Sequence, residues 1–318
     1  MAKLKTIKKE MEKSDIFILF NQGNYDQIFD VFDNIDDINI INNEGKTPLF
    51  ISCEKGNVSV VKLLLSNIKT DVNLITEQVD LSPLHIAVRN KNIEIIDLLL
   101  SNTNIDVNKR TKGDEYTPLH FACMLDDDEM NFILKKLLSH HAINVNSMEV
   151  FDNYTPLHVA CWNGLVNPVK ELLKCNATIV NGYNEEDTPL HVACVQGFDE
   201  VVKILLNNVW INVNSGSASP LHLACLYGNV GVVRVLLSYA ATKVNQATDY
   251  GETPLYMACE SGHEGVVRLL LSYAVTKVNQ ARTDNGTTSM DIACQKNQTK
   301  IVELLLADSR TKRINLSV

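Results

Sequence analysis

A membrane-spanning helix needs an apolar run of about 18 residues, and no run in the sequence approaches this length. Residues 1–13 are charged and lack an apolar stretch, so they do not have the character of a secretory signal. The chain also lacks an excess of basic residues, because 29 Lys and Arg stand against 38 Asp and Glu, for a formal net charge of −9. Duplex nucleic acid is bound through a basic face, so this charge argues against a nucleic-acid partner.

Motifs of the common enzyme classes are missing as well. The chain has no nucleophile elbow, phosphate-binding loop, Gly-rich dinucleotide turn or His-Glu-x-x-His metal motif. No segment rich in Pro, Gly and Ser divides the 318 residues into separate domains. We therefore expect no catalytic residue, no cofactor and no enzymatic activity.

One short motif recurs along the whole chain. Its full form, Thr-Pro-Leu-His-Val-Ala-Cys, occupies residues 155–161, and successive copies begin 31 to 38 residues apart. The copies begin at Thr47, Ser82, Thr117, Thr155, Thr188, Ser219, Thr253 and Thr288. A period of this length is typical of an array of one supersecondary unit. The functional question is then which part of a long surface binds another molecule.

Each copy carries the sequence signals of two short helices. Thr or Ser stands at the N-cap position of the first helix, and Pro follows at its first position in most copies. An apolar segment and a Gly come next. The second helix has apolar residues at i, i+3 and i+4, as in the Val-Val-Arg-Leu-Leu-Leu of residues 266–271. The pattern predicts helix pairs that each bury one apolar stripe.

The motif resembles the ankyrin repeat, whose signature is Thr-Pro-Leu-His-x-Ala and whose intact form begins here at Thr117, Thr155 and Thr188. The resemblance covers about residues 47–308. It implies an all-α solenoid of stacked antiparallel helix pairs with β-hairpin-like fingers along one edge. We expect a basic lead at residues 1–13, a degenerate N-terminal capping repeat at 14–46 and eight repeats over 47–318, the last of them a C-terminal cap. All of these belong to a single predicted solenoid domain.

The cysteines and histidines follow the repeat. Seven of the eight cysteines fall at one repeat position, namely Cys53, Cys123, Cys161, Cys194, Cys225, Cys259 and Cys294. We interpret them as small buried thiols in a reducing compartment, which favours the cytoplasm, with the nucleus as the alternative. The spacing of His120 and Cys123 on one helix face would also suit zinc. Repeats spaced along a line do not bring four ligands together, however, and the resemblance implies a structural His that hydrogen bonds the Thr hydroxyl and the finger backbone. We therefore predict no metal site.

The positions that vary between copies are the candidates for binding. By resemblance to the family, two positions between the repeat Cys and the next Gly, and one before each Thr-Pro, lie on the concave face. These positions are polar or charged toward both ends of the array and apolar or aromatic in the middle. With two finger residues added, the predicted partner-binding set is Tyr116, Met124, Leu125, Phe151, Tyr154, Trp162, Tyr183, Val195, Leu226 and Tyr227. Exposed apolar area with aromatic anchors is typical of protein interfaces, so we predict a central groove that binds a protein or peptide.

Three irregularities accompany this set. Residues 126–129, all acidic, form an insertion that is either a solvated loop or an attractor for a basic partner segment. A shortened finger at residues 215–218 predicts a notch in the groove wall. Lys91 replaces the Gly between two helices, which predicts local backbone strain.

Together these patterns predict an intracellular protein–protein interaction module, with the role of scaffold, adaptor or inhibitor. We expect a monomer whose partner is a protein or peptide with some basic character. The alternative is a structural spacer or tether, held to an anionic membrane or to the cytoskeleton through the basic N-terminus. Its support in the sequence is a group of five lysines: Lys3, Lys5, Lys8, Lys9 and Lys13.

Overall fold

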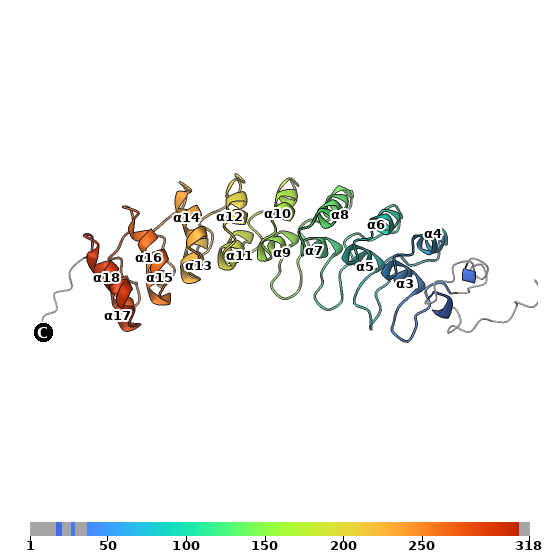
Figure 1. Cartoon of the computed structure of the whole chain (residues 1–318), viewed down its shortest axis with the longest axis horizontal. Coiled ribbons are helices and arrows are strands. Elements are labelled where there is room, and N and C mark those ends of the chain that lie inside the picture. The colour runs from blue at the N-terminus through green and yellow to red at the C-terminus, as the bar shows by residue number, and fades with distance from the viewer. Residues whose placement is uncertain (1–16, 21–26, 29–36, 312–318) are drawn as a thin grey trace, which may run out of the picture. The chain divides into compact units, whose positions relative to one another are not determined.

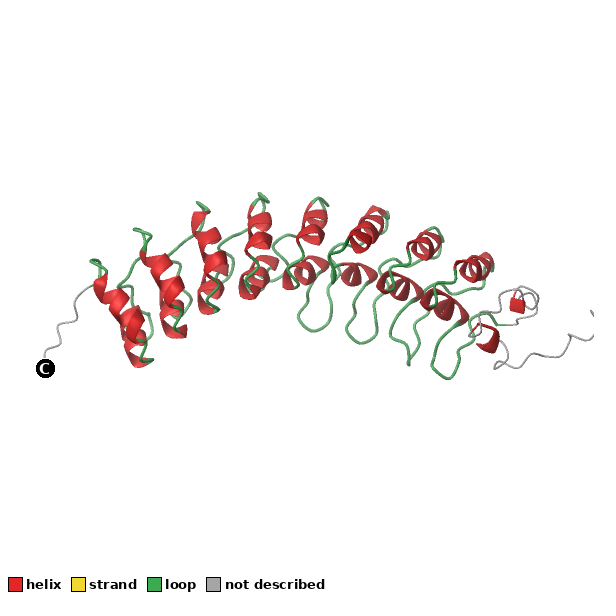
Figure 2. Cartoon of the chain, in the orientation of Figure 1, coloured by secondary structure: helices red, strands yellow, loops and turns green. Residues whose placement is uncertain are grey.

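The computed structural model describes residues 17–20, 27–28 and 37–311, which are almost entirely helices and connecting turns (Figure 2). The chain divides into two compact units, Met1–Pro156 and Leu157–Val318, and each is described by itself. The basic lead expected at residues 1–13 lies outside the described residues. Of the expected capping repeat, Phe17, Phe20 and Ile28 are buried. The repeat boundaries and the single domain inferred from the sequence stay predictions.

The first unit is a succession of helix pairs (Figure 1). Its helices are α3 (Pro48–Glu54), α4 (Val58–Ser66), α5 (Pro83–Arg89), α6 (Ile93–Leu100), α7 (Pro118–Ala122) and α8 (Asp128–Ser139). The first helices of the pairs pack in sequence, α3 on α5 and α5 on α7, while the second helices α4 and α6 pack on each other. Each first helix also packs on the second helix of its own pair.

The second unit repeats this arrangement. Its helices are α9 (Pro156–Trp162), whose first residue ends the first unit, α10 (Val166–Leu173), α11 (Pro189–Gln196), α12 (Asp199–Leu206), α13 (Pro220–Leu226), α14 (Val230–Ser238), α15 (Pro254–Ser261), α16 (Glu264–Leu271), α17 (Ser289–Gln295) and α18 (Thr299–Ala307). The first helices pack in one row, α11, α13, α15 and α17. The second helices pack in another row, α10, α12, α14, α16 and α18. The predicted all-α solenoid is confirmed.

The fingers are turns closed by backbone hydrogen bonds. Thr111 N donates to Tyr116 O at 2.9 Å, for example, and Thr248 N donates to Glu252 O at 2.9 Å. Within residues 37–311 the β-structure is limited to one isolated antiparallel bridge, between Ala281 and Thr288. The fingers therefore resemble hairpins in their path without forming strands.

The Thr/Ser-Pro-x-His start of a first helix joins one repeat to the next. At α5, Ser82 is the N-cap in extended backbone, and its N–H donates to His85 Nδ1 at 3.2 Å. Because a neutral imidazole accepts at one nitrogen and donates at the other, Nε2 of His85 carries the proton. Nε2 then donates to Tyr116 O of the next finger at 3.0 Å. The structural role implied for the repeat His is present here, and it extends beyond its own repeat.

The same bond to the next finger recurs in both units. It joins His120 to Tyr154 O at 3.1 Å, His158 to Asp187 O at 3.1 Å and His222 to Glu252 O at 3.0 Å. Burial is the main cause that lowers the pKa of His85, His120 and His222 to about 4. The folded protein therefore holds these rings neutral, in the form that the bond requires.

Asparagines make a second link between neighbouring repeats. Asn245 Nδ2 donates to Val275 O at 2.7 Å, and Asn245 Oδ1 accepts from Lys277 N at 2.7 Å. The same pair of bonds is made by Asn39, Asn73, Asn108, Asn181 and Asn214. This asparagine ladder holds the turns that follow the second helices in register within each unit.

The prediction of seven buried thiols is wrong at one position. Cys53 and Cys123 are fully buried, and burial raises the pKa of both thiols well above the usual range. Four further repeat cysteines are also buried, whereas Cys294 is exposed and Cys175 is half-buried. Cys294 lies on α17, which packs on α15 at one side. Within the described residues no later first helix covers the other side of α17.

Three of the four acidic residues of the insertion at 126–129 belong to the N-terminus of helix α8. Asp127 is the N-cap of α8, and its Oδ1 accepts from Met130 N at 2.9 Å. Asp128 and Glu129 form the first helical turn, where negative charge suits the helix dipole. Asp127 also pairs with Lys91, whose φ of 56° confirms the strained backbone expected there. Helix capping thus explains much of this acidic cluster.

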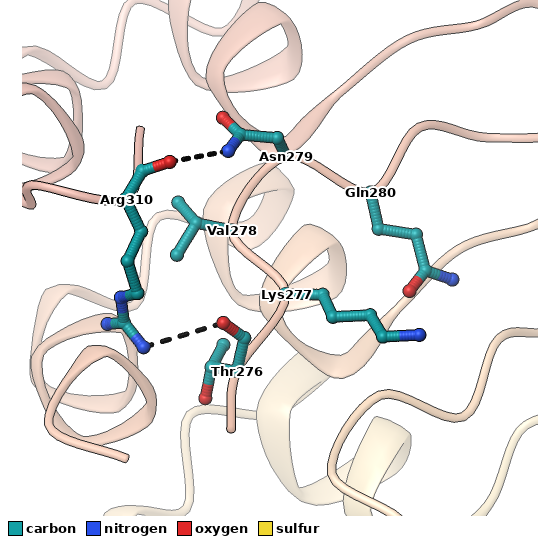
Figure 3. Close-up of a pocket in the computed structure, with 6 residues that line it drawn as sticks. All are labelled: Thr276, Lys277, Val278, Asn279, Gln280 and Arg310. Atoms are coloured by element: carbon teal, nitrogen blue, oxygen red, sulfur yellow. Dashed lines mark hydrogen bonds between the residues drawn. The ribbon is translucent and has the colours of Figure 1, made fainter. Parts of the chain in front are cut away.

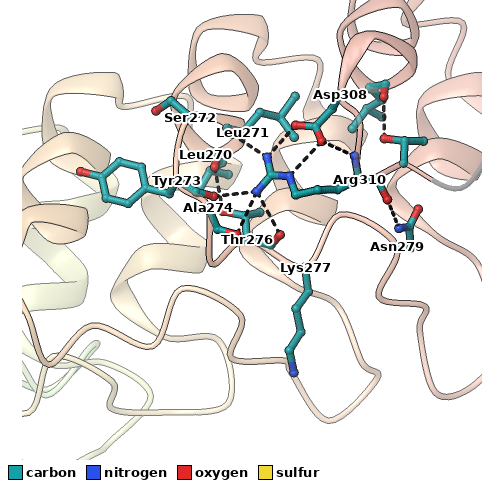
Figure 4. Close-up of polar contacts among 12 residues, drawn as sticks. Leu270, Leu271, Ser272, Tyr273, Ala274, Thr276, Lys277, Asn279, Asp308 and Arg310 are labelled. Carbon is teal, nitrogen blue, oxygen red and sulfur yellow. Dashed lines mark hydrogen bonds and ion pairs between the residues drawn. The ribbon is translucent and has the colours of Figure 1, made fainter.

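Arg310 caps helix α16 from the following repeat (Figure 4). Its guanidinium donates to Leu271 O at 2.6 Å and to Tyr273 O at 2.8 Å, and it pairs with Asp308 Oδ2 at 2.6 Å. Leu271 is the last residue of α16, so this bond satisfies a carbonyl that the helix leaves unpaired. The positive charge also suits the negative end of the helix dipole.

We expect Arg310→Ala to lower the free energy of unfolding of the last two helix pairs by about 1–2 kcal/mol, because helix-end carbonyls lose a charged donor. Arg310→Lys should restore only part of the loss, since an ammonium cannot pair with a carboxylate and bridge two carbonyls in the same geometry. Native-state hydrogen exchange of amides in α16 and α18 measures the effect. Lys296→Ala, which removes an exposed charge at the C-cap of α17, is the control. Unchanged protection in Arg310→Ala would contradict the capping role.

The buried histidines predict a loss of stability in mild acid. Their pKa is lower in the folded chain, about 4, than the ordinary value of 6.5, so between these values the unfolded chain binds more protons. The free energy of unfolding should therefore decrease as the pH falls through this range, by up to about 1.4 kcal/mol per pH unit for each histidine. Urea midpoints at pH 7, 6 and 5 measure the slope.

His85→Gln is the matched variant for this test, because its amide can still donate to Tyr116 O but does not titrate. We expect it to be less stable than the wild type at pH 7 and to lose stability less steeply as the pH falls. Parallel slopes for the two proteins would rule out His85 as a source of the pH dependence.

Candidate protein-binding surface

Five of the predicted binding residues lie in the first unit. Leu125 and Phe151 are exposed, whereas Tyr116, Met124 and Tyr154 are half-buried. The Tyr116 ring stacks on the His120 ring, with centroids 5.2 Å apart, and meets Phe121 edge-on at 6.3 Å. Part of the Tyr116 surface is thus used for packing on α7, the first helix of its own repeat. Leu125 and Phe151 contribute most of the exposed apolar surface of this set in the first unit.

The other five predicted residues lie in the second unit. Trp162 is 49% exposed, Tyr183 is 58% exposed and Tyr227 is 54% exposed. Val195 and Leu226 are half-buried. Trp162, Val195 and Leu226 occupy equivalent positions at the ends of first helices, and α11 and α13 pack directly on each other. The equivalent position on the next first helix, α15, holds Glu260.

A finger fixed by His158 presents Tyr183. The ring of His158 lies against Gly182, where an added Cβ would be 3.1 Å from His158 Nε2 and where φ is 66°. Both the space and the backbone conformation therefore favour glycine at this position. The same ring donates to Asp187 O at the other end of the finger, at 3.1 Å. Tyr183 is thus carried on a loop that is held at two points.

The predicted notch at residues 215–218 lies next to this finger. Glu186 Oε1 accepts from Ser217 N at 2.8 Å, and Glu186 Oε2 lies close to Gly216. The shortened finger is therefore partly lined by a carboxylate of the preceding finger. Whether a partner uses this place stays a prediction.

Charges are separated within the second unit. Its fingers and first helices carry eight acidic residues, which are Glu185, Glu186, Asp187, Asp249, Glu252, Glu260, Asp284 and Asp291. The same segments carry two basic residues, Arg282 and Lys296. Arg282 is neutralised by Glu252 at 2.8 Å and Asp284 at 2.7 Å. The apolar residues of this side are therefore set among negative charges.

The described ranges contain no group of three or more His, Cys, Asp or Glu side chains arranged to hold a metal ion. The His120 ring is instead bonded to Thr117 and Tyr154, as the structural interpretation of the repeat His requires. No helix of the part of the chain that the structure describes is both long and apolar enough to cross a membrane.

Several exposed apolar residues were not predicted from the sequence. Val209, Trp210 and Val275 are more exposed than most of the predicted set, and all three lie in turns that follow second helices. A signal was present, because the equivalents of Trp210 in the first unit are Lys69, Asn104 and Ala142. Trp210 is thus a large aromatic residue at a position that holds polar or small residues in the first unit, as expected for a solvated turn.

Comparison with protein families gives one result for almost the whole chain. A family model described as ankyrin repeats (3 copies) matches residues 16–111, 104–182, 169–248 and 242–317. Comparison with curated proteins gives no match. Repeats of this family generally mediate protein–protein interactions. The helix pairs and capping boxes of both units agree with this match, and the chain belongs to the ankyrin repeat family.

Proposed function

We propose that this chain is a protein-binding module whose main contact surface in the second unit is formed by Trp162, Tyr183, Val195, Leu226 and Tyr227. The observation that carries the proposal is the set of three exposed aromatic side chains on first helices and a finger. We call the five residues together the first-helix surface. Trp162, Val195 and Leu226 stand at equivalent repeat positions, Tyr227 follows Leu226, and Tyr183 lies on a finger.

The aromatic residues can supply much of the binding free energy. Burying apolar surface contributes about 25 cal/mol per Å², and an aromatic side chain buries about 150–250 Å² in full. Covering the exposed half of Trp162 or Tyr227 would then contribute about 2–3 kcal/mol each. Such residues dominate interfaces when they lie at the centre of the contact.

The surface is also largely preorganised. Trp162 ends a helix, Tyr227 is the C-cap of α13, and the finger of Tyr183 is held by His158. A partner therefore pays little for ordering the backbone that carries these side chains, and more of the contact energy appears as affinity.

The charges indicate the chemistry of the partner. Glu185 is exposed beside Tyr183, and Glu260 continues the series of Trp162, Val195 and Leu226. A segment with apolar or aromatic residues and one or more Lys or Arg would complement this pattern. We propose such a segment as the partner, and a scaffold, adaptor or inhibitor role for the module.

In the first unit, Leu125 and Phe151 form a further candidate contact for the same kind of partner. The alternative function, a membrane or cytoskeletal tether, depends on lysines at residues 1–13, which lie outside the described residues. No contact of the described residues favours the tether, so the binding module is the function that we propose.

We expect Trp162→Ala and Tyr227→Ala each to weaken partner binding about 10- to 30-fold, the effect of removing an interface anchor. Affinity capture from the native cell with wild-type protein identifies the partner, and titration of the purified pair gives the affinities. Phe132→Ala, which removes an exposed aromatic residue from the second helix α8, is the matched control and should bind normally. Full binding by both surface variants would refute the proposed surface.

The same titration tests the charge of the partner. If a basic segment meets Glu185 and Glu260, raising the salt concentration should slow association, and Glu185→Gln should reduce that salt dependence. An affinity that does not change with salt would show that the partner is held by apolar contacts alone.

A further inference from the structure

We propose that the turns after the second helices of the second unit form another docking surface, for an extended protein segment that combines one apolar side chain with acidic ones. We call this surface the turn row and define it by Val209, Trp210, Ala241, Lys243, Val275 and Lys277. It is distinct from the first-helix surface, because every residue of the row follows a second helix.

The turn row is unusually apolar for connecting turns. Val209 is 85% exposed, Trp210 is 76% exposed and Val275 is 64% exposed. Ala241, at the position equivalent to Trp210 in the next repeat, is exposed too. A connecting turn on the surface is normally polar, and exposed apolar area of this kind marks interaction sites. Trp210 is one of only two tryptophans in the chain.

The asparagine ladder fixes the turn row in place. The backbone carbonyls of Trp210, Ala241 and Val275 accept from the side chains of the asparagines in the preceding repeats, at 2.7, 2.8 and 2.7 Å. The backbone N–H groups of Lys243 and Lys277 donate to the same kind of asparagine oxygen. The row is therefore an ordered surface, and a ligand would not have to order it.

A hollow of about 640 Å³ lies beside Trp210. Leu173, Thr178 and Val180 line it from one repeat, and Asn207, Asn208 and Trp210 line it from the next. Its lining combines three asparagine amides and the Thr178 hydroxyl with apolar side chains, which suits a peptide that offers an apolar side chain together with backbone hydrogen-bonding groups. This mixture fits a peptide better than it fits a lipid chain.

Lysines without an ion-pair partner among the described residues continue the row. Lys243 and Lys277 are exposed and have no carboxylate within ion-pair distance in the part of the chain described. Two nearby lysines are neutralised, Lys174 by Glu171 at 2.8 Å and Lys203 by Glu200 at 3.1 Å. Positive charge is thus available at two successive turns, and the ligand that complements it is acidic.

A second hollow, of about 490 Å³, lies beside Lys277 (Figure 3). Arg310 also lines it, but the guanidinium of Arg310 is occupied by Asp308 and the end of α16. Figure 3 shows the Lys277 side chain directed away from Arg310. Lys277 is therefore the cation of this hollow that can meet a ligand carboxylate.

The spacing of the repeats sets the pattern of the ligand. Packed helices lie about 8–10 Å apart, and an extended chain advances about 3.3 Å per residue. About three residues of an extended segment therefore span one repeat. A segment with an apolar residue at the Trp210 hollow would meet Lys243 about three residues on and Lys277 about six residues on. The expected sequence is apolar-x-x-acidic-x-x-acidic, in either chain direction.

An anionic membrane fits the turn row less well. Each lysine near such a surface contributes about 1 kcal/mol, and stable attachment usually requires a larger basic cluster. The turn row offers two lysines, Lys243 and Lys277, which is fewer than such a cluster. Two lysines at successive turns are enough for a short segment with two acidic residues.

The test is selection of a displayed library of random twelve-residue peptides on the full chain, followed by fluorescence anisotropy with the enriched peptides. We expect one class with the apolar-x-x-acidic-x-x-acidic pattern. Trp210→Ser should weaken its binding at least tenfold, and Lys243→Ser at least threefold. Ile68→Ser, which removes an equally exposed apolar residue from a turn of the first unit, is the matched control and should have no effect.

The outcomes separate this proposal from the proposed function. Peptides that depend on Trp162 but not on Trp210 would support the first-helix surface and overturn the turn row, as would the absence of any enriched acidic class. Peptides that depend on Trp210 and bind normally to Trp162→Ala would support the turn row whatever the fate of the other surface. Sedimentation with phosphatidylserine vesicles is the third arm, and Trp210-dependent vesicle binding would overturn the peptide in favour of a membrane.

Discussion

The hydrogen bond from a neutral repeat histidine to the next finger is the contact on which the rest of the structure depends. It requires that Nδ1 accept from the N-cap backbone, so that Nε2 can donate across the repeat boundary, as His85 does to Tyr116 O at 3.0 Å. A protonated ring would lose the acceptor, and burial prevents that protonation. One residue thus couples the start of a local helix to the stacking of the next repeat.

Where the histidine is replaced, other chemistry joins the repeats. Tyr256 stands at this position on α15 and is buried. Arg282 of the following finger packs over the Tyr256 ring at 5.5 Å and donates to its hydroxyl at 3.4 Å. Arg282 also pairs with Glu252, which precedes α15. A cation from the next finger therefore links the two repeats in the absence of the imidazole.

Helix positions were predictable because their causes are local. The Ser82-Pro83 pair marks both the N-cap and the first helical residue of α5. Gly197 ends α11 with a φ of 82°, a conformation that glycine adopts readily. The exposure of Cys294 was not predictable, because it depends on which helix lies beside α17. The partial burial of Tyr116 was not predictable either, because the repeat pattern does not show that its ring stacks on His120. Most of the predicted binding residues are at least partly exposed, but the prominence of Trp210 follows from the turn geometry that the asparagine ladder imposes.

The two proposed surfaces use the two kinds of link between repeats. The histidine bonds hold the fingers, and with them the acidic first-helix surface, while the asparagine bonds hold the turns that carry Lys243 and Lys277. Within the second unit the acidic residues thus lie mainly on the fingers and first helices, whereas the two lysines lie on the turns that follow second helices. Both surfaces are ordered before a partner arrives. Binding at one surface therefore does not change the conformational entropy that the chain loses when the other surface is bound. Coupling between sites requires a difference between states that both ligands can bias. A rigid repeat offers none, so the free energies of binding at the two surfaces should add.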